Sequence, residues 1–428
     1  MSESFKKLGE VADIETGFPF KSSDFTEIGV PVIRMSDLTQ GSVDLSGAAK
    51  VKTSALEGLK KFRLIRGDFL FGLSGSLDAY GVHDSDAEAY LNQRVGRLQA
   101  LESEPSNYSY LSHVLSSDVY RSYAYRVASG IAQLNISPNQ VRDLPIFYPS
   151  LPEQQKISQI LDTLDTQIQK TEALIAKLEK IKEGLLHDLL TRGINQNGQL
   201  RPTPEQAPEL YKKSVLGLIP REWDISTLGG SSISSVIGPF GSDLVASDYR
   251  SEGVPVVFVR DIAGAQYDRV SQVFVSPRKA QALSAHEVTA GDLLLTKMGL
   301  PPCISAVYPK REPAGIITAD IVRLRLKADV APEWAHHYVN SEAVKSQVRG
   351  ITAGVTRPKV TLKDARSLRI AVPDIEEQAR ILSILQRSSS RLESESASLA
   401  KLRAQKSGLM DDLLTGRTRV ASLLKDSI

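Results

Sequence analysis

Apolar residues recur at alternating steps of four and three along two long stretches of the chain. The first stretch begins at Ile157 and ends at Leu189, and the second begins at Ile381 and ends at Leu413. Such spacing, sustained over about four heptads, is typical of helices paired in a coiled coil, although a long core helix in a bundle would also show it. The predicted seam consists of Ile157, Leu161, Leu164, Ile168, Ile175, Leu178, Leu185, Leu189, Ile381, Leu385, Leu392, Leu399, Leu402, Leu409 and Leu413.

Terminal residues of both stretches suit helix ends. Pro152 and Glu153 suit the start of the first helix and the Glu376-Glu377 pair the start of the second, because early carboxylates complement the helix dipole. Gly193 and Gly416 suit the two stops. A helix of roughly 38 residues is about 57 Å long. Two related seams in one chain favour antiparallel pairing with each other.

The chain also repeats itself at a spacing of 224 residues. Gly29-Val-Pro-Val-Ile-Arg-Met-Ser-Asp37 aligns with Gly253-Val-Pro-Val-Val-Phe-Val-Arg-Asp261, with five identities in nine positions. The same offset places Glu153-Gln154 on Glu377-Gln378 and Leu189-Leu-Thr191 on Leu413-Leu-Thr415. Upstream the offset becomes 220, which indicates a four-residue loop insertion. The sequence therefore predicts a tandem duplication of a globular domain followed by a helix.

Each globular domain mixes short β-rich runs with helical stretches, such as Tyr110 to Val127 and Trp334 to Val348. This mixture predicts an α+β fold in two tandem-duplicated globular domains, separated by two long helices that form an antiparallel coiled coil. The predicted divisions are residues 1–151 (first globular domain), 152–193 (first helix), 194–217 (linker), 218–373 (second globular domain), 374–416 (second helix) and 417–428 (C-terminal tail).

Charge alone does not identify a partner, because 52 Lys and Arg balance 50 Asp and Glu. A basic face is nevertheless predicted between Glu342 and Arg369, where seven basic residues meet two acidic ones. The single Cys303 excludes an internal disulfide and fits a reducing cytoplasm. No stretch resembles a membrane span or an apolar leader, so a cytoplasmic location without membrane contact is expected.

Motifs of common enzyme sites are missing from the sequence. The histidines show no H-x-x-x-H or H-E-x-x-H spacing for a metal, and no G-x-x-x-x-G-K-S/T phosphate loop is present. The only Pro-Pro, in Leu300-Pro301-Pro302-Cys303, lacks the polar and aromatic neighbours of an amino-methyltransferase loop. The sequence therefore predicts neither a catalytic nor a metal site.

A family resemblance follows from these motifs together. Each globular domain leads into Pro-x-x-x-Glu-Gln and a long helix that ends in Leu-Leu-Thr, and the second copy opens with Leu216-Gly-Leu-Ile-Pro-Arg-Glu-Trp223. This combination resembles the specificity (S) subunit of type I restriction-modification systems over nearly the whole chain. Two departures are that the second helix start reads Asp374-Ile-Glu-Glu-Gln378 and that the first copy lacks an Ile-Pro-x-x-Trp entry.

The resemblance implies a non-catalytic subunit whose two target-recognition domains each read one half of a bipartite, asymmetric site in double-stranded DNA. The helix pair would fix the gap between the half-sites and dock two modification (methyltransferase) subunits, which restriction (endonuclease/translocase) subunits join. S-adenosylmethionine is expected in the partner methyltransferase, which methylates adenine, and no cofactor is expected in this chain. Two alternatives remain open, a self-sufficient DNA-modifying enzyme and a structural coiled-coil spacer without DNA specificity.

Residues for DNA contact are predicted in loops, where long polar side chains reach base edges and hydroxyl groups reach phosphates. Ordinary turn chemistry would explain the same residue types equally well. Arg34 and Arg260, next to the duplicated G-V-P-V strand, are also consistent with structural ion pairs. The predicted DNA-binding residues are Lys21, Ser22, Ser74, Ser76, Gln133, Asn135, Ser242, Lys297, Thr356, Arg357 and Lys359.

Overall fold

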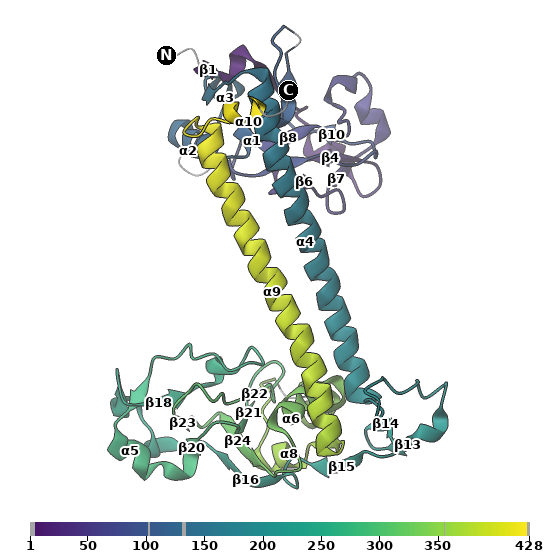
Figure 1. Cartoon of the computed structure of the whole chain (residues 1–428), viewed down its shortest axis with the longest axis vertical. Coiled ribbons are helices and arrows are strands. Elements are labelled where there is room, and N and C mark those ends of the chain that lie inside the picture. The colour runs from purple at the N-terminus through teal and green to yellow at the C-terminus, as the bar shows by residue number, and fades with distance from the viewer. Residues whose placement is uncertain (1–4, 102, 131–133, 355, 426–428) are drawn as a thin grey trace. The chain divides into compact units, whose positions relative to one another are not determined.

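The computed structural model describes residues 5–101, 103–130, 134–354 and 356–425 (Figure 1). The chain divides into two compact units, one formed by Met1–Leu174 with Glu395–Ile428 and the other by Ile175–Ser394. Each unit contains one globular domain and a part of both long helices. The fold is α+β, as the sequence predicts.

The two long helices, α4 (Leu151–Thr191) and α9 (Ile375–Leu414), have 41 and 40 residues and are unbroken in Figure 1. Both start with acidic residues in the first turn, and Gly193 and Gly416 follow their ends with φ of 61° and 75°. Within the first unit Lys406 contacts Asp165 and Arg403 contacts Glu172, so the helices run in opposite directions there. Every apolar residue of the predicted seam is buried or half-buried.

The globular domain of the first unit contains two main sheets. One has the order β2-β11-β8-β9-β6-β5 and the other the order β10-β4-β7-β3, while β1 pairs with β12. The strands are β1 (Phe5–Lys7), β2 (Ala12–Thr16), β3 (Phe25–Thr26), β4 (Val30–Ile33), β5 (Leu38–Thr39), β6 (Gly41–Val43), β7 (Ala49–Val51), β8 (Phe69–Gly72), β9 (Tyr80–Val82), β10 (Tyr90–Leu91), β11 (Val95–Ala100) and β12 (Pro145–Phe147). The short helices of this unit are α1 (Tyr108–Leu115), α2 (Asp118–Val127), α3 (Pro138–Arg142) and α10 (Ala421–Lys425).

The second unit repeats this plan with sheets β16-β24-β21-β22 and β17-β19-β18-β23-β20, and with β15 paired to β25. Its strands are β13 (Tyr211–Ser214), β14 (Gly217–Pro220), β15 (Asp224–Thr227), β16 (Ser232–Ile237), β17 (Tyr249–Arg250), β18 (Val254–Val257), β19 (Phe274–Val275), β20 (Glu287–Val288), β21 (Leu293–Thr296), β22 (Ser305–Val307), β23 (Gly315–Ile317), β24 (Ile321–Leu326) and β25 (Arg369–Val372). Its short helices are α5 (Pro277–Ala282), α6 (Pro332–Val339), α7 (Glu342–Thr352) and α8 (Leu362–Ser367).

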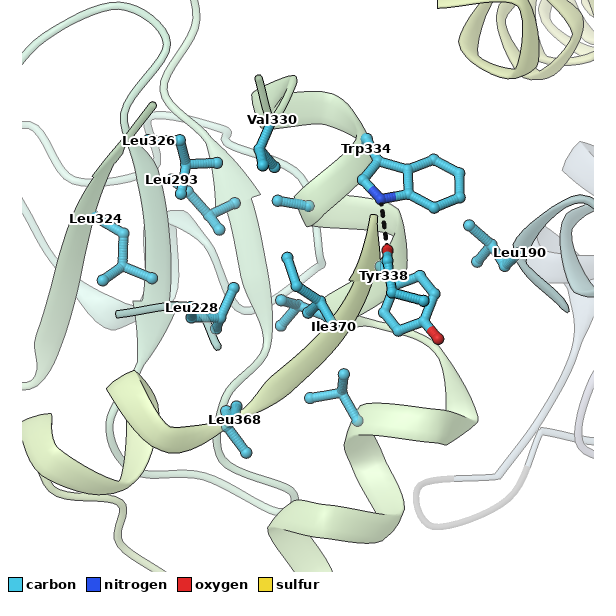
Figure 2. Close-up of a cluster of buried hydrophobic side chains, with 14 of the residues drawn as sticks. Leu190, Leu228, Leu293, Leu324, Leu326, Val330, Trp334, Tyr338, Leu368 and Ile370 are labelled. Atoms are coloured by element: carbon cyan, nitrogen blue, oxygen red, sulfur yellow. Dashed lines mark hydrogen bonds between the residues drawn. The ribbon is translucent and has the colours of Figure 1, made fainter. Parts of the chain in front are cut away.

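Buried hydrogen bonds repeat at the offset of 224 found in the sequence. The Tyr110 hydroxyl donates to the Phe147 carbonyl at 2.5 Å, and the Trp334 indole N–H donates to the Ala371 carbonyl at 3.0 Å (Figure 2). In each case an aromatic side chain on a short helix anchors that helix to the strand that precedes a long helix. Figure 2 also shows Leu190, from the end of α4, beside Trp334 and Tyr338 in the core of the second unit.

A second repeated contact explains the glutamine that recurs at each long-helix start. The Gln154 side-chain oxygen accepts the Asn107 N–H at 2.9 Å, and the Gln378 oxygen accepts the Ala331 N–H at 2.8 Å. Both glutamines are fully buried, and each bond satisfies the N–H of a partly buried residue. We call these glutamine bonds, together with the Tyr110 and Trp334 bonds, the shared frame.

Two expectations from the sequence need correction. The predicted linker, residues 194–217, is not only a connector, because β13 and β14 form a hairpin that starts within it and Arg201 is buried. The helical stretches predicted from Tyr110 and from Trp334 are each two helices. The second helix of each pair starts after a serine with extended backbone at the N-cap position, and the Ser117 side chain also accepts the Tyr120 N–H.

Candidate nucleic-acid interface

A polar cleft of about 620 Å³ opens on the globular domain of the first unit. Strands β4 and β10 are parallel neighbours, so the residues that follow them meet at one edge of the sheet. The Asn92 N–H fixes this meeting by donating to the Ile33 carbonyl at 3.1 Å. The cleft is lined by Phe20, Ser22, Phe25, Arg34, Met35, Ser36, Ser74, Gly75, Ser76, Asn92, Gln93 and Arg94.

Three predicted residues, Ser22, Ser74 and Ser76, lie together in this first cleft. Ser22 and Ser76 are exposed, whereas the Ser74 hydroxyl is buried and has no hydrogen-bond partner among the described residues. Asn135 is exposed and joins Ser74 through a β-bridge. Lys21 does not line the cleft. Its backbone N–H donates to the Asp24 carboxylate at 2.7 Å. Gln133 lies outside the described residues.

Sequence reasoning missed the turn between β10 and β11, which contributes Asn92, Gln93 and Arg94 to the cleft. Three polar residues between the apolar ends of two strands are the signal that could have found it. The sequence is consistent with a structural ion pair for Arg34. Its Nε lies 3.8 Å from an Asp37 carboxylate oxygen, and its side chain also lines the cleft.

The second unit has a corresponding cleft of about 410 Å³. Here the parallel pair is β18 and β23, and the Thr318 N–H donates to the Val257 carbonyl at 3.0 Å. The lining residues are Pro239, Gly241, Leu244, Tyr249, Phe258, Val259, Arg260, Thr318, Ala319 and Asp320. Both clefts contain two aromatic side chains, but the first has two arginines, whereas the second has one arginine and the carboxylate of Asp320.

The sequence is also consistent with a structural ion pair for Arg260, but in the structure this arginine makes other contacts. Its guanidinium lies 4.6 Å from the centre of the Phe258 ring, and its Nε donates to the Ser271 hydroxyl at 2.6 Å. These two contacts hold the arginine against the wall of the second cleft.

Lys297 is the predicted residue that the structure places differently. It is only 4% exposed, its ammonium donates to the Ala319 carbonyl at 2.9 Å, and it lies 5.0 Å from the Phe240 ring centre. Burial, reinforced by the positive charge of Lys359, lowers its pKa. Lys297 is therefore buried in the second unit, with its ammonium bonded to Ala319, a residue that lines the cleft.

The remaining predicted residues of the second unit lie on exposed loops. Ser242 follows Gly241 of the cleft, and Thr356, Arg357 and Lys359 lie on the segment after α7. Lys359 forms a backbone β-bridge with Met298, the counterpart of the bridge between Asn135 and Ser74. Contact of these residues with DNA stays a prediction.

Among the described residues, no three or more histidine, cysteine, aspartate or glutamate side chains lie together in a way that could hold a metal ion. Within the same residues, no helix has an apolar stretch that could cross a lipid bilayer.

Comparisons with known proteins agree with the duplicated fold. The MjaX specificity subunit of a type I restriction enzyme from Methanocaldococcus jannaschii is 25% identical, over 98% of this chain and 97% of that protein. The EcoBI specificity subunit of Escherichia coli is 26% identical, over 88% of this chain and 77% of that protein.

Solved structures show the same fold along almost the whole chain. A chain from a study of complex assembly in the type I R-M system aligns with a TM-score of 0.59 and 18% identity, covering 97% of this chain and 98% of its own length. The S subunit from M. genitalium aligns with a TM-score of 0.55 and 14% identity, covering 96% of this chain and 95% of its own length. The family model for the type I restriction modification DNA specificity domain matches residues 3–180 and 290–404. The chain belongs to this family of type I restriction modification DNA specificity proteins.

Proposed function

We propose that this chain is the non-catalytic DNA-specificity subunit of a type I restriction-modification complex. Each globular domain reads one half of a bipartite, asymmetric site. The observation that carries this function is the pair of clefts, which occupy the same place in two copies of one fold but carry different side chains. Two copies with equal chemistry would read two equal half-sites, whereas these two read different ones.

The two long helices set the gap between the half-sites and dock the methyltransferase subunits. The catalytic steps belong to the partners, a methyltransferase that binds S-adenosylmethionine and a restriction subunit that cleaves DNA. The chain needs no cofactor of its own, and the assembled complex acts in the cytoplasm. With a net charge of only +2, this chain shares the phosphate contacts with its partners.

Methylation mapping tests this function. Genomic DNA is compared between cells that carry the chain with its neighbouring methyltransferase and cells that lack the chain alone. The expected result is a bipartite methylated motif with a fixed gap, which disappears in the deletion strain. Unchanged methylation without the chain would contradict the proposal. Binding of labelled S-adenosylmethionine by the purified chain would favour the self-sufficient enzyme instead.

The role of the helices has its own test. Seven residues are inserted into α4 between positions 174 and 175 and into α9 between positions 394 and 395, which preserves the seam. Each helix becomes longer by about 10 Å, so the gap should grow by about three base pairs at 3.4 Å per base pair. The matched control places seven residues in the exposed Asn197–Gly198 turn, where the gap should stay unchanged. An unchanged gap after the helix insertions would show that the helices do not set it.

A further inference from the structure

We propose that Arg94 reads a guanine in one half-site and that Asp320 reads a cytosine in the other. This proposal rests on the function proposed above and names the side chains that distinguish the two domains. It places both residues at one structurally equivalent position, at which the two copies of the fold carry opposite charges.

Backbone contacts establish that the two positions are equivalent. The Arg94 carbonyl accepts the Leu73 N–H at 3.0 Å, and the Asp320 carbonyl accepts the Lys297 N–H at 2.8 Å. Leu73 and Lys297 are themselves separated by the repeat offset of 224, and each comes directly after a central strand, β8 or β21. The same hydrogen bond therefore fixes the backbone of Arg94 and of Asp320.

A close backbone approach fixes the start of the same turn in both domains. A Cβ on Gly17 would lie 2.0 Å from the Leu91 carbonyl oxygen, and a Cβ on Gly238 would lie 2.2 Å from the Thr318 carbonyl oxygen. Only glycine fits against another backbone at such distances, so both glycines let the chain pass tightly across the turn. The turn that carries Arg94 or Asp320 is thus held from two sides before any ligand binds.

Within the described residues, the functional groups at these fixed positions have no direct polar partner. The Arg94 guanidinium and the Asp320 carboxylate form no hydrogen bond or ion pair there, although each residue lines its cleft. The Lys297 ammonium attracts the Asp320 carboxylate electrostatically, but its hydrogen bond goes to the Ala319 carbonyl at 2.9 Å. A fixed backbone with an unused polar group is the arrangement expected of a residue that recognises a ligand.

Opposite charges at one position decide between phosphate and base contact. A phosphate would attract Arg94 but repel Asp320, so a shared position facing the DNA backbone would not tolerate the exchange. Base edges accommodate both, because the arginine fork pairs with O6 and N7 of guanine and a carboxylate accepts from N4 of cytosine. The position therefore faces the bases in both domains.

Four variants test this assignment in the complete complex, with methylation mapped across the genome. Arg94→Ala should relax one guanine position, with about 10- to 100-fold loss of discrimination, while the other half-site stays unchanged. Asp320→Asn should relax one cytosine position in the opposite half-site by a similar factor. The matched controls are Arg66→Ala, an exposed arginine paired with Asp84 outside the cleft, and Asp329→Asn in an exposed turn; both should leave the motif unchanged.

The outcomes separate this proposal from the function on which it rests. If the wild-type chain directs no bipartite methylation, the proposed function fails first. If wild type directs it but Arg94→Ala leaves both half-sites unchanged, or weakens all positions equally as a lost phosphate contact would, the assignment is overturned. Methylation of the unaltered half-site in each variant shows that the chain is folded and assembled.

Discussion

The two globular domains keep the same buried contacts but differ in their clefts. Gln154 and Gln378 accept hydrogen bonds from equivalent backbone N–H groups, and Tyr110 and Trp334 donate to equivalent carbonyl groups. The equivalent cleft positions carry Arg94 in one domain and Asp320 in the other. Buried polar groups must find fixed partners, whereas cleft residues can change with the ligand. The shared frame therefore keeps the fold while the clefts change specificity.

The comparison is sharpest at the glutamates that precede these glutamines. The Glu377 carboxylate accepts from Arg201 at 2.5 and 3.0 Å, from the Ile194 N–H and from the Trp223 indole. The Glu153 carboxylate accepts from Arg419, at 3.0 and 2.6 Å. The Arg201 side chain is 8% exposed but the Arg419 side chain is 49% exposed. Water can therefore replace the carboxylate only at Arg419.

The largest expected effect follows from this difference. Glu377→Ala should lower the free energy of unfolding of the second unit by about 3–5 kcal/mol, because it leaves a buried guanidinium without its main partner. Tryptophan fluorescence during urea unfolding measures this unit alone, since the two tryptophans, Trp223 and Trp334, both lie in it. Glu153→Ala is the matched variant, and because Glu153 lies in the first unit its smaller effect is measured by hydrogen exchange on peptides from α1. Equal losses of stability in the two units would contradict the comparison.

An equal effect is expected where the domains are alike. Gln154→Leu and Gln378→Leu each leave a partly buried backbone N–H and a buried proline carbonyl without their partners, at a cost of about 2–3 kcal/mol per unit. Hydrogen exchange, followed on peptides from α1 for the first unit and from α6 for the second, measures each loss separately. A change limited to one unit would show that the shared frame does not carry equal weight in both.

The long helices and the duplication could be predicted from the sequence because both are patterns along the chain. Apolar residues from Ile157 to Leu189 repeat regularly, and Glu153-Gln154 recurs as Glu377-Gln378. The clefts could not be predicted, because they depend on parallel pairing of β4 with β10 and of β18 with β23. Each pairing joins segments far apart in sequence, which is why Arg94 was missed and why the burial of Lys297 could not be predicted.

The C-terminal tail offers the smallest test, because its contact with the first unit is partly exposed. Arg419 makes a two-pronged ion pair with Glu153, and its guanidinium lies 5.4 Å from the Phe147 ring centre. The Glu153 side chain is only 5% exposed. Hydrogen bonds from Arg419 are the main cause that holds the pKa of Glu153 below its ordinary value of 4.5.

Arg419→Ala should therefore destabilise the first unit by about 1 kcal/mol at neutral pH, a small value because solvent screens the half-exposed arginine. A lowered carboxyl pKa stabilises the folded state above the ordinary glutamate pKa, and this stabilisation disappears as the pH falls through the folded-state pKa. Calorimetric unfolding of wild type and variant should thus differ at neutral pH and converge as the pH falls below the ordinary glutamate pKa and through the folded-state pKa of Glu153. Arg417→Ala is the matched control, because Arg417 pairs with Asp411 within the same tail region and leaves Glu153 untouched. A difference that persists unchanged in acid would mean that Arg419 stabilises the unit through its packing on Phe147. The ion pair between Arg419 and Glu153 would then not stabilise the first unit in the way that the ion pair between Arg201 and Glu377 stabilises the second.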